Sequence, residues 1–179
     1  SIEPSWDYGV VLRSSLELAR DGSLTDTAYF SRYPFQVYPL LYMTFFMKLI
    51  HARTMAAACG VSYVLNIIHI LVALYGAFFV GKLLHGKRFG LKILLFCMCS
   101  APLFLYASIC YTDTLALPFP VWTLALWLYA RKMPALTKQQ KWKKTALYVG
   151  SGMMAGFGLR IKSIAAIGLI ALMIFLLFL

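Results

Sequence analysis

Acidic residues are scarce in this chain, and they are unevenly distributed. The 179 residues contain six Asp and Glu against 17 Lys and Arg, a formal net charge of +11. Five of the six acids lie in the first 26 residues, and Asp113 is the sixth. Charged residues of both signs make up only 13% of the chain, about half the share of an average soluble domain, while 61% of the residues are hydrophobic. This composition excludes an ordinary soluble domain and is typical of an integral membrane protein.

The basic excess does not indicate nucleic-acid binding. The Lys and Arg residues flank long apolar runs, which is where membrane topology places them. Cysteine is also sparse, and the four cysteines have no paired metal-ligand spacing with the three histidines. We therefore expect free, buried thiols and no zinc site, with a divalent cation at the acids left open.

Both ends of the sequence lack the features of a complete membrane protein. The first residue is not Met, and the last apolar run, 164–179, ends without the polar flank that normally closes a transmembrane helix. We expect a chain truncated at both ends, with one further membrane helix before Ser1.

Residues 1–60 are amphipathic rather than uniformly apolar, and we expect them to form a loop with interfacial helices. Apolar residues recur at helical spacing between Tyr8 and Ala19, with Gly22 just past the predicted helix end. A Tyr-rich segment at 29–39 follows, in which two prolines are expected to break regular helix, and then a short apolar run at 40–50. Both segments are typical of a membrane interface.

Four apolar runs in residues 61–179 approach the length of a membrane span. They lie at about 61–81, 91–110, 115–130 and 145–179. The last run is too long for one helix and is interrupted by Arg160 and Lys162, so we divide it into two. The prediction is an all-α, polytopic protein of the cell membrane, with about five crossings in this chain.

The basic residues predict the orientation. They gather in two loops, Lys82–Lys92 and Arg131–Lys144, and neither loop contains an acid. By the positive-inside rule both loops face the cytoplasm, and an even number of crossings separates them. Residues 1–60, the turn at Asp113 and the segment 160–162 are therefore expected together on the extracytoplasmic face.

Ionisable residues between apolar helices are candidates for function, because their burial is costly. Asp113 is a candidate site residue, and Asp113 or Thr112 is a candidate cap of the helix expected to begin near Leu115; the two roles are compatible. Arg160 and Lys162 need an anionic partner on this face, which is either Asp113 in a structural ion pair or the phosphate of a ligand. Arg32 either binds the same phosphate or extends to the membrane surface. Asp7 either caps the first helix or accepts a proton from a hydroxyl or amine nucleophile.

The order of these motifs resembles the first large loop and the following helices of the GT-C membrane glycosyltransferases. The segments that carry the resemblance are Trp6-Asp7-Tyr8, Leu18–Gly22, Arg32–Gln36, Pro39–Tyr42, Tyr111–Leu115 and Gly158–Lys162. Within that superfamily the chain is most similar to the N-terminal portion of bacterial family-39-like enzymes, which are related to protein O-mannosyltransferases and to the lipid A aminoarabinose transferase. Two departures are the single acid at Asp7, where the aminoarabinose transferase type has a pair, and Arg32-Tyr33-Pro34 in place of Lys-Pro-Pro.

The resemblance implies a role for each candidate residue. Asp7 would be the catalytic base and Asp113 a second catalytic acid that organises the site. The donor phosphate would be held by Arg32, Arg160 and Lys162. The lipid or sugar would be lined by Tyr33, Gln36, Tyr38 and Tyr111.

The predicted function is an inverting transfer of a sugar from a polyprenyl-phosphate carrier to an acceptor on the extracytoplasmic face. The expected partners are the polyprenyl-phosphate-linked sugar and membrane lipid, and the acceptor is not specified by the sequence. One alternative is a transporter with Asp113 and Lys162 as a charge relay, although the sequence has no internal repeat. Another is a non-catalytic scaffold, in which the polar residues are only caps and ion pairs.

Overall fold

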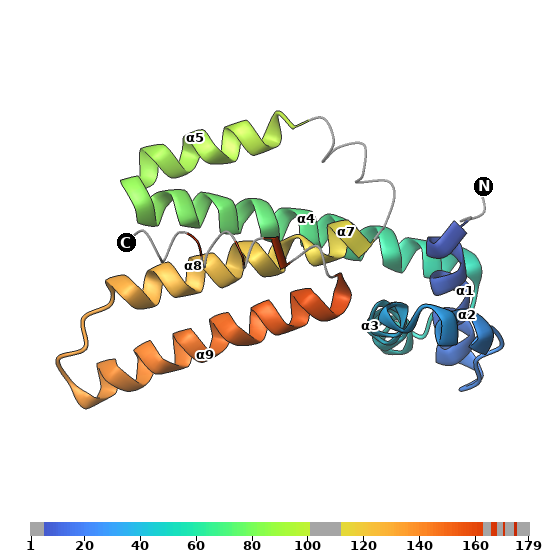
Figure 1. Cartoon of the computed structure of the whole chain (residues 1–179). Helices are drawn as coiled ribbons and strands as arrows, with labels where there is room; N and C mark the ends of the chain where they lie inside the picture. The colour runs from blue at the N-terminus through green and yellow to red at the C-terminus, as the bar shows by residue number, and fades with distance from the viewer. Residues whose placement is uncertain (1–5, 101–111, 163–165, 168–169, 171–173, 175–179) are drawn as a thin grey trace.

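The computed structural model describes residues 6–100, 112–162, 166–167, 170 and 174 (Figure 1). Within these residues all regular structure is helical, which confirms the predicted all-α class. Cys59, Cys97 and Cys99 are free thiols, as predicted, but none of the three is buried: Cys59 and Cys97 are partly exposed and Cys99 is exposed. Cys110 lies outside the described residues.

Four helices lie side by side and form the body of the molecule. They are α4 (Met55–His85), α5 (Lys87–Met98), α8 (Pro118–Lys132) and α9 (Lys138–Ile161). In Figure 1, α4 packs between α5 and α8, and α9 packs on the far side of α8. α4 and α5, and likewise α8 and α9, run in opposite directions because the connection within each pair is short.

Among the described residues, α4 is the one helix long and apolar enough to cross a membrane. It covers the predicted run 61–81 and spans about 46 Å of helix axis at 1.5 Å per residue. It begins earlier than predicted because the side chain of Thr54 accepts a hydrogen bond from the Ala57 N–H and caps it. The number of crossings beyond this helix remains a prediction.

Glycines allow the closest contact between α4 and α5. A methyl group added at Gly90 would lie 2.6 Å from the carbonyl oxygen of Phe78, and one at Gly81 would lie 2.9 Å from the Cα of Gly90. Small residues at such contacts let two backbones approach closely, which is a common device in membrane helices. The α4–α5 hairpin is therefore held at a short distance that larger side chains would not permit.

Proline and polar residues determine where α7, α8 and α9 begin and end. The predicted run 115–130 forms two helices, α7 (Thr112–Ala116) and α8, because Pro118 starts the second. α9 begins at Lys138, earlier than predicted, behind a capping box made by Thr137 and Gln140. It ends at Ile161, so the predicted interruption at Arg160 and Lys162 is confirmed as a helix end. Of the run 91–110, α5 covers the start, and residues 101–110 are not described.

The first loop folds into three helices and one 3-10 turn. They are α1 (Trp6–Arg20), α2 (Thr27–Arg32), η1 (Pro34–Gln36) and α3 (Val37–Leu49). The predicted amphipathic helix is confirmed by α1, which is followed by Gly22 at a positive φ of 71°.

The two prolines of this loop behave differently from one another. Pro34 follows the end of α2, as predicted, because the residue before a proline is disfavoured in helix. The prediction that Pro39 also breaks helix is wrong. Pro39 lies in the first turn of α3, where its missing N–H would have no helical acceptor.

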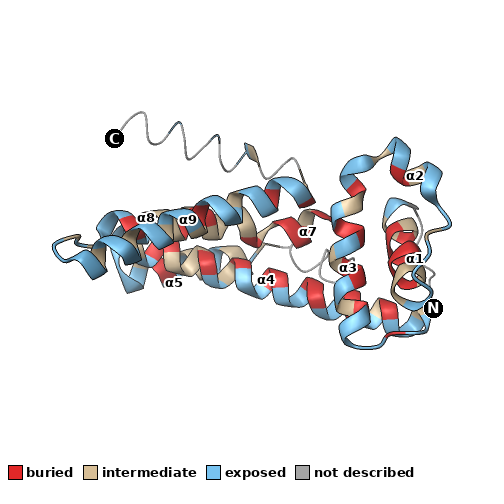
Figure 2. Ribbon diagram, turned by 90° about the horizontal axis from the view of Figure 1, so that it is seen from below, coloured by how far each residue is buried: buried red, intermediate tan, exposed pale blue. Residues whose placement is uncertain are grey.

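The loop helices lie across one end of the four-helix body. Figures 1 and 2 show α1 and α3 running across the direction of α4 rather than along it. Their shared core is fully buried at Leu12 and Met47 and continues onto α4 at Ala58 and Leu65. Figure 2 also shows exposed residues along the outer faces of α4, α5 and α9, where many large apolar side chains lie. Such surfaces suit contact with lipid.

Charge separates along the length of the body. The connection between α4 and α5 and the loop between α8 and α9 lie at the same end, away from α1 and α3 (Figure 1). We call this the basic end. The end that carries α1, α3, α7 and the close of α9 is the polar end. The two basic loops predicted to share a membrane face are thus neighbours in space.

Candidate functional site

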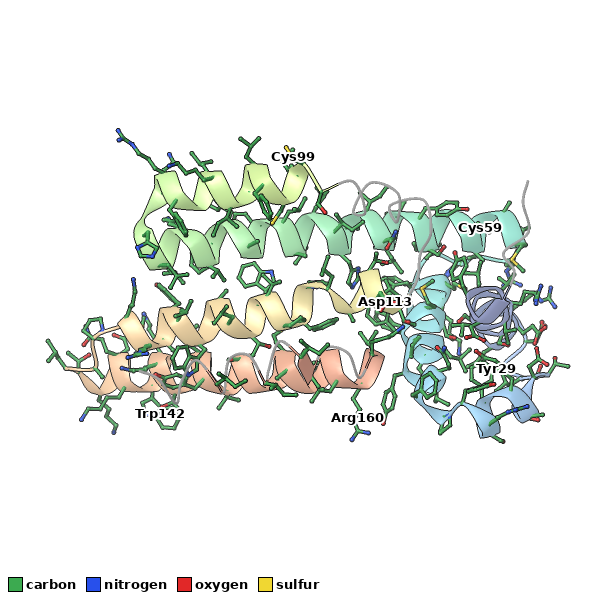
Figure 3. All side chains as sticks on the ribbon, turned by 45° about the horizontal axis from the view of Figure 1, so that its top comes forward. Tyr29, Cys59, Cys99, Asp113, Trp142 and Arg160 are labelled. Atoms are coloured by element: carbon green, nitrogen blue, oxygen red, sulfur yellow. The ribbon has the colours of Figure 1, made fainter. Side chains whose placement is uncertain are left out.

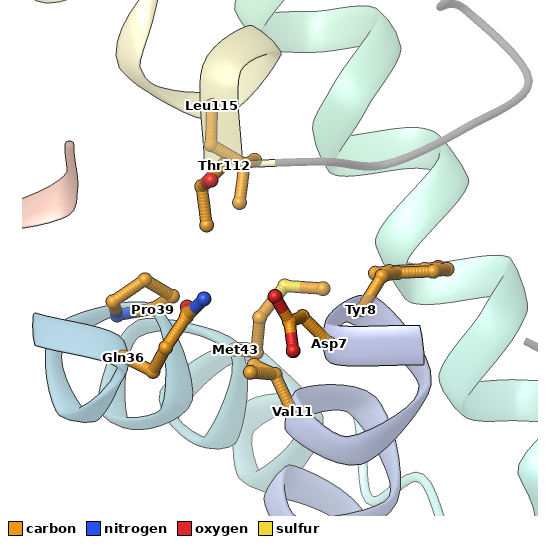
Figure 4. Close-up of a pocket in the computed structure, with 8 residues that line it drawn as sticks. All are labelled: Asp7, Tyr8, Val11, Gln36, Pro39, Met43, Thr112 and Leu115. Carbon is orange, nitrogen blue, oxygen red and sulfur yellow. The ribbon is translucent and has the colours of Figure 1, made fainter. Parts of the chain in front are cut away.

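The polar end contains a small pocket between three parts of the chain that are distant in sequence (Figure 4). It is lined by Asp7, Tyr8, Val11, Gln36, Pro39, Met43, Thr112 and Leu115. Its volume of about 10 Å³ leaves room for about one water molecule. We call it the Asp7 pocket, and most of its wall is apolar.

Asp7 contributes a carboxylate to this pocket from the first turn of α1. Because α1 begins at Trp6, Asp7 lies inside the helix and is not its N-cap, so the capping alternative does not hold. A carboxylate in the first turn is still favoured by the helix dipole. Among the described residues, no hydrogen bond or ion pair holds the Asp7 side chain, which is exposed and faces the pocket (Figure 4).

Gln36 is the buried polar group of the same pocket. Gln36 is the last residue of η1 and is only 4% exposed. Its Oε1 has no hydrogen-bond partner in the described structure. Figure 4 shows its amide reaching toward the space between Asp7 and Thr112. An unpaired buried acceptor costs about 1–3 kcal/mol, so this placement is unfavourable for the fold alone.

Asp113 and Lys162 form an ion pair beside the Asp7 pocket. Lys162 Nζ lies 2.9 Å from Asp113 Oδ2 and donates a second hydrogen bond to Thr112 Oγ1 at 3.3 Å. Lys162 follows the end of α9, and Asp113 lies in the first turn of α7. Of the two partners proposed for Lys162 from sequence, Asp113 is therefore the one in contact. Thr112 connects the pair to the pocket, because it also lines the wall.

The other predicted cations lie outside the Asp7 pocket. Arg160 donates a hydrogen bond to the Tyr38 hydroxyl at 2.8 Å and lies 5.1 Å from the centre of its ring, which joins α9 to α3. Arg32 is exposed and lies 5.7 Å from the ring centre of Tyr33. Figure 3 shows Asp113 and Arg160 near α3, far from Trp142 at the basic end. Tyr111 lies outside the described residues.

A polar stripe on α4 was missed by the sequence analysis. Ser62, Asn66 and His69 are buried at helical spacing within an otherwise apolar run. Ser62 hydrogen-bonds the hydroxyl of Tyr8, and His69 Nε2 lies 2.8 Å from the hydroxyl of Tyr42. The stripe therefore fixes α1 and α3 onto α4. The spacing of these residues was visible in the sequence, but their partners are distant in it.

A second, larger cavity opens beside α4 and α8. Its volume is about 550 Å³, and its wall is almost entirely apolar. The lining residues are Tyr42, Ile68, His69, Val72, Pro118, Phe119, Trp122, Leu126 and Met154. We call it the apolar cavity. It lies close to the Asp7 pocket, since Tyr42 and Met43 are neighbours on α3 and face one cavity each.

The described part of the chain has no group of three or more His, Cys, Asp or Glu side chains placed to hold a metal ion. Within the described residues, Asp7 and Asp113 therefore belong to no group of three potential metal ligands. The site chemistry that can be described is that of two carboxylates, a carboxamide, a hydroxyl and a lysine ammonium.

Sequence comparison adds one match. A family described as "Conserved hypothetical integral membrane protein" matches residues 3–179. No curated protein and no solved structure matches the chain significantly. The family description gives a membrane location and no activity.

Proposed function

The chain belongs to the conserved hypothetical integral membrane protein family, and we propose that it is a membrane glycosyltransferase. It transfers a sugar from a polyprenyl-phosphate carrier to an acceptor on the extracytoplasmic face, with inversion at the anomeric carbon. The observation that carries this proposal is the contrast between two acids at one end of the fold.

The two acids stand in different surroundings. Asp113 is held by Lys162, whereas Asp7 faces a pocket with its carboxylate unpaired among the described residues. An unpaired carboxylate at a pocket is able to accept a proton, and a paired one is better suited to hold a neighbouring cation in place. Asp7 is accordingly the base, and Asp113 positions Lys162.

The transfer step balances with these groups. The acceptor nucleophile, a hydroxyl or an amine, attacks the anomeric carbon of the donor sugar while Asp7 takes the acceptor proton. The bond between that carbon and the phosphate oxygen breaks, and the phosphate leaves with the electron pair. The leaving phosphate needs positive charge rather than a proton donor, and Arg160 and Lys162 at the end of α9 bring cations to the polar end.

The apolar cavity supports a lipid-linked donor. Its wall of aromatic and aliphatic side chains suits a hydrocarbon chain, and Tyr42 and His69 provide polar atoms at one side. Leu115 lines the Asp7 pocket, and Phe119, four residues later, lines the apolar cavity. A carrier lipid in the cavity would therefore have its phosphate within reach of the polar end.

The positive-inside rule supports an extracytoplasmic location of the site. The basic end carries the α4–α5 connection at Gly86 and the loop between α8 and α9, and the candidate site lies at the other end. Cysteine accessibility at the two ends in intact cells would test this orientation. Labelling of an engineered cysteine in the α8–α9 loop from outside the cell would contradict it.

Sugar transfer is the direct test of the proposal. The full-length protein in native membranes would be incubated with radiolabelled polyprenyl-phosphate sugars, and label entering other products would be measured. We expect transfer by the wild type and a loss of about 10²-fold or more in Asp7→Asn, because general-base catalysis contributes about that much.

Asp26→Asn is the matched control, because Asp26 precedes α2 in the same loop and makes no capping hydrogen bond with its side chain. Its transfer rate should equal that of the wild type. Wild-type transfer by Asp7→Asn would remove the proposed mechanism. Absence of transfer with every donor, together with sugar uptake into proteoliposomes, would favour the transporter instead.

A further inference from the structure

The side chain of Gln36 is buried, yet its Oε1 contributes no hydrogen bond to the described fold. That atom has no hydrogen-bond partner in the described structure, and the side chain does not cap α3, although Gln36 stands at its N-cap position. Native proteins keep few such groups, and each one calls for a ligand, a water molecule or a catalytic role. A methionine or leucine would fill the same volume without this cost.

The amide of Gln36 reaches into the Asp7 pocket. The polar atoms around that pocket come from three separate elements: Asp7 from α1, Gln36 from η1 and Thr112 from α7 (Figure 4). The remaining wall is largely apolar, so a polar group that enters must bond to these three side chains. The pocket admits a group about the size of one water molecule.

We propose that Gln36 is a substrate-contacting residue, whose carboxamide holds one hydroxyl group of the acceptor beside Asp7. This inference rests on the proposed function, because it names the chemical class of the acceptor group that reacts there. Without Gln36, only Asp7 and Thr112 would orient the incoming oxygen.

Hydrogen-bond chemistry and charge favour a hydroxyl over an amine. A hydroxyl both donates and accepts, which matches a carboxylate that only accepts and a carboxamide that does both. An ammonium group only donates, and it would stand near Lys162, whose Nζ lies 3.3 Å from Thr112 Oγ1. The lysine ammonium therefore disfavours a second cation in the pocket.

The first test separates a substrate contact from a structural role. Gln36→Met keeps the length of the side chain and removes its polar atoms, so the thermal midpoint of the full-length protein in nanodiscs should stay equal or rise. Gln139→Met, on the exposed first turn of α9, is the matched control. A fall in the midpoint of Gln36→Met well beyond that of the control would show a structural residue and overturn the inference.

The second test measures binding without catalysis. Saturation-transfer difference NMR would use methyl α-D-glucopyranoside and its 6-amino-6-deoxy analogue as probes. We expect a signal for the glucoside with the wild type, a weaker one for the amine, and a glucoside affinity reduced about fivefold or more in Gln36→Met. Equal signals in wild type and Gln36→Met, stronger binding of the amine, or no wild-type signal would each overturn the inference.

The two proposals fail in distinguishable ways. Transfer by the wild type with an undiminished rate in Gln36→Met would reject only the role of Gln36. Gln36-dependent binding of the glucoside without transfer from any donor would reject only the proposed function.

Discussion

Lys162 and Asp113 join the end of α9 to the start of α7 through an ion pair of 2.9 Å. The two side chains are 28% and 43% exposed, so solvent screens the attraction and the pair stabilises the fold by about 1 kcal/mol or less. Its main effect is geometric, since it fixes the lysine ammonium beside Thr112 and the Asp7 pocket.

Exchange of the two charges separates stability from function. Lys162→Met and Asp113→Asn each should lower the thermal midpoint slightly, and the double variant Asp113→Lys with Lys162→Asp should recover part of that loss. Transfer activity should not recover, because the ammonium then extends from α7 instead of the end of α9. Thermal unfolding and sugar transfer, measured on the same preparations, check this. Full recovery of transfer would mean that only the pairing matters.

The close α4–α5 contact predicts that adding a single methyl group at Gly90 lowers the stability of the protein substantially. Gly90→Ala places a methyl group 2.6 Å from the Phe78 carbonyl oxygen, so the helices must separate at a cost of about 1–3 kcal/mol. Gly152→Ala is the control, because Gly152 is exposed on α9 and no atom lies near the added carbon. This substitution should leave the stability unchanged or raise it slightly. Thermal unfolding in detergent compares the two. Equal midpoints would contradict the close packing.

The hydrogen bond between Tyr42 and His69 predicts that one hydroxyl group contributes measurably to holding α3 on α4. Tyr42→Phe leaves the buried His69 Nε2 without that hydroxyl, at a cost of about 1–3 kcal/mol. Tyr63→Phe, exposed on the same α4, should change the free energy of unfolding very little. Hydrogen exchange of the α3 amides should accelerate in Tyr42→Phe and stay unchanged in Tyr63→Phe. Acceleration in both variants would argue against a specific link.

The pairing of Arg20 with Asp21 gives a pH-dependent prediction for the loop. Hydrogen bonds from the Arg20 guanidinium lower the pKa of the Asp21 carboxyl below its ordinary value. Because the folded pKa is the lower one, the stabilisation is present above the ordinary Asp pKa of about 4 and is lost as the pH falls through the folded value.

Arg20→Gln should raise the Asp21 pKa toward its ordinary value, which carboxyl carbon NMR titration measures directly. Arg13→Gln, at an exposed position of α1, is the matched control and should leave the Asp21 titration unchanged. An unchanged Asp21 titration in Arg20→Gln would mean that the pair does not persist in solution.

Sequence patterns were sufficient to predict a helix when the residues that end it lie next to it in the sequence. α1 could be predicted from its apolar spacing and from Gly22, and the end of α9 from two cations in an apolar run, since both signals lie within one segment. Pro39 was misread because a proline is tolerated in a first turn, and the start of α3 was not evident beforehand.

The residues of the Asp7 pocket come together through contacts between distant segments, which the spacing of residues in the sequence does not reveal. Asp7 and Thr112 meet only because α1 lies across the end of α4 while α7 packs against α4. Gln36 was expected near the lipid or sugar, but its burial follows from how η1 packs against α3 and α9 and could not be inferred locally. Arg32 was grouped with the donor phosphate, yet α2 leaves it over Tyr33, away from the pocket.

The narrowness of the Asp7 pocket has a further consequence. A space that admits a single hydroxyl admits water equally well, and water presents the same donor and acceptor atoms to Asp7 and Gln36. Selectivity for the acceptor over water must then come from parts of the acceptor that bind outside the pocket. In the absence of acceptor, the protein should hydrolyse its donor slowly, and release of free sugar would be a background reaction intrinsic to the shape of this site.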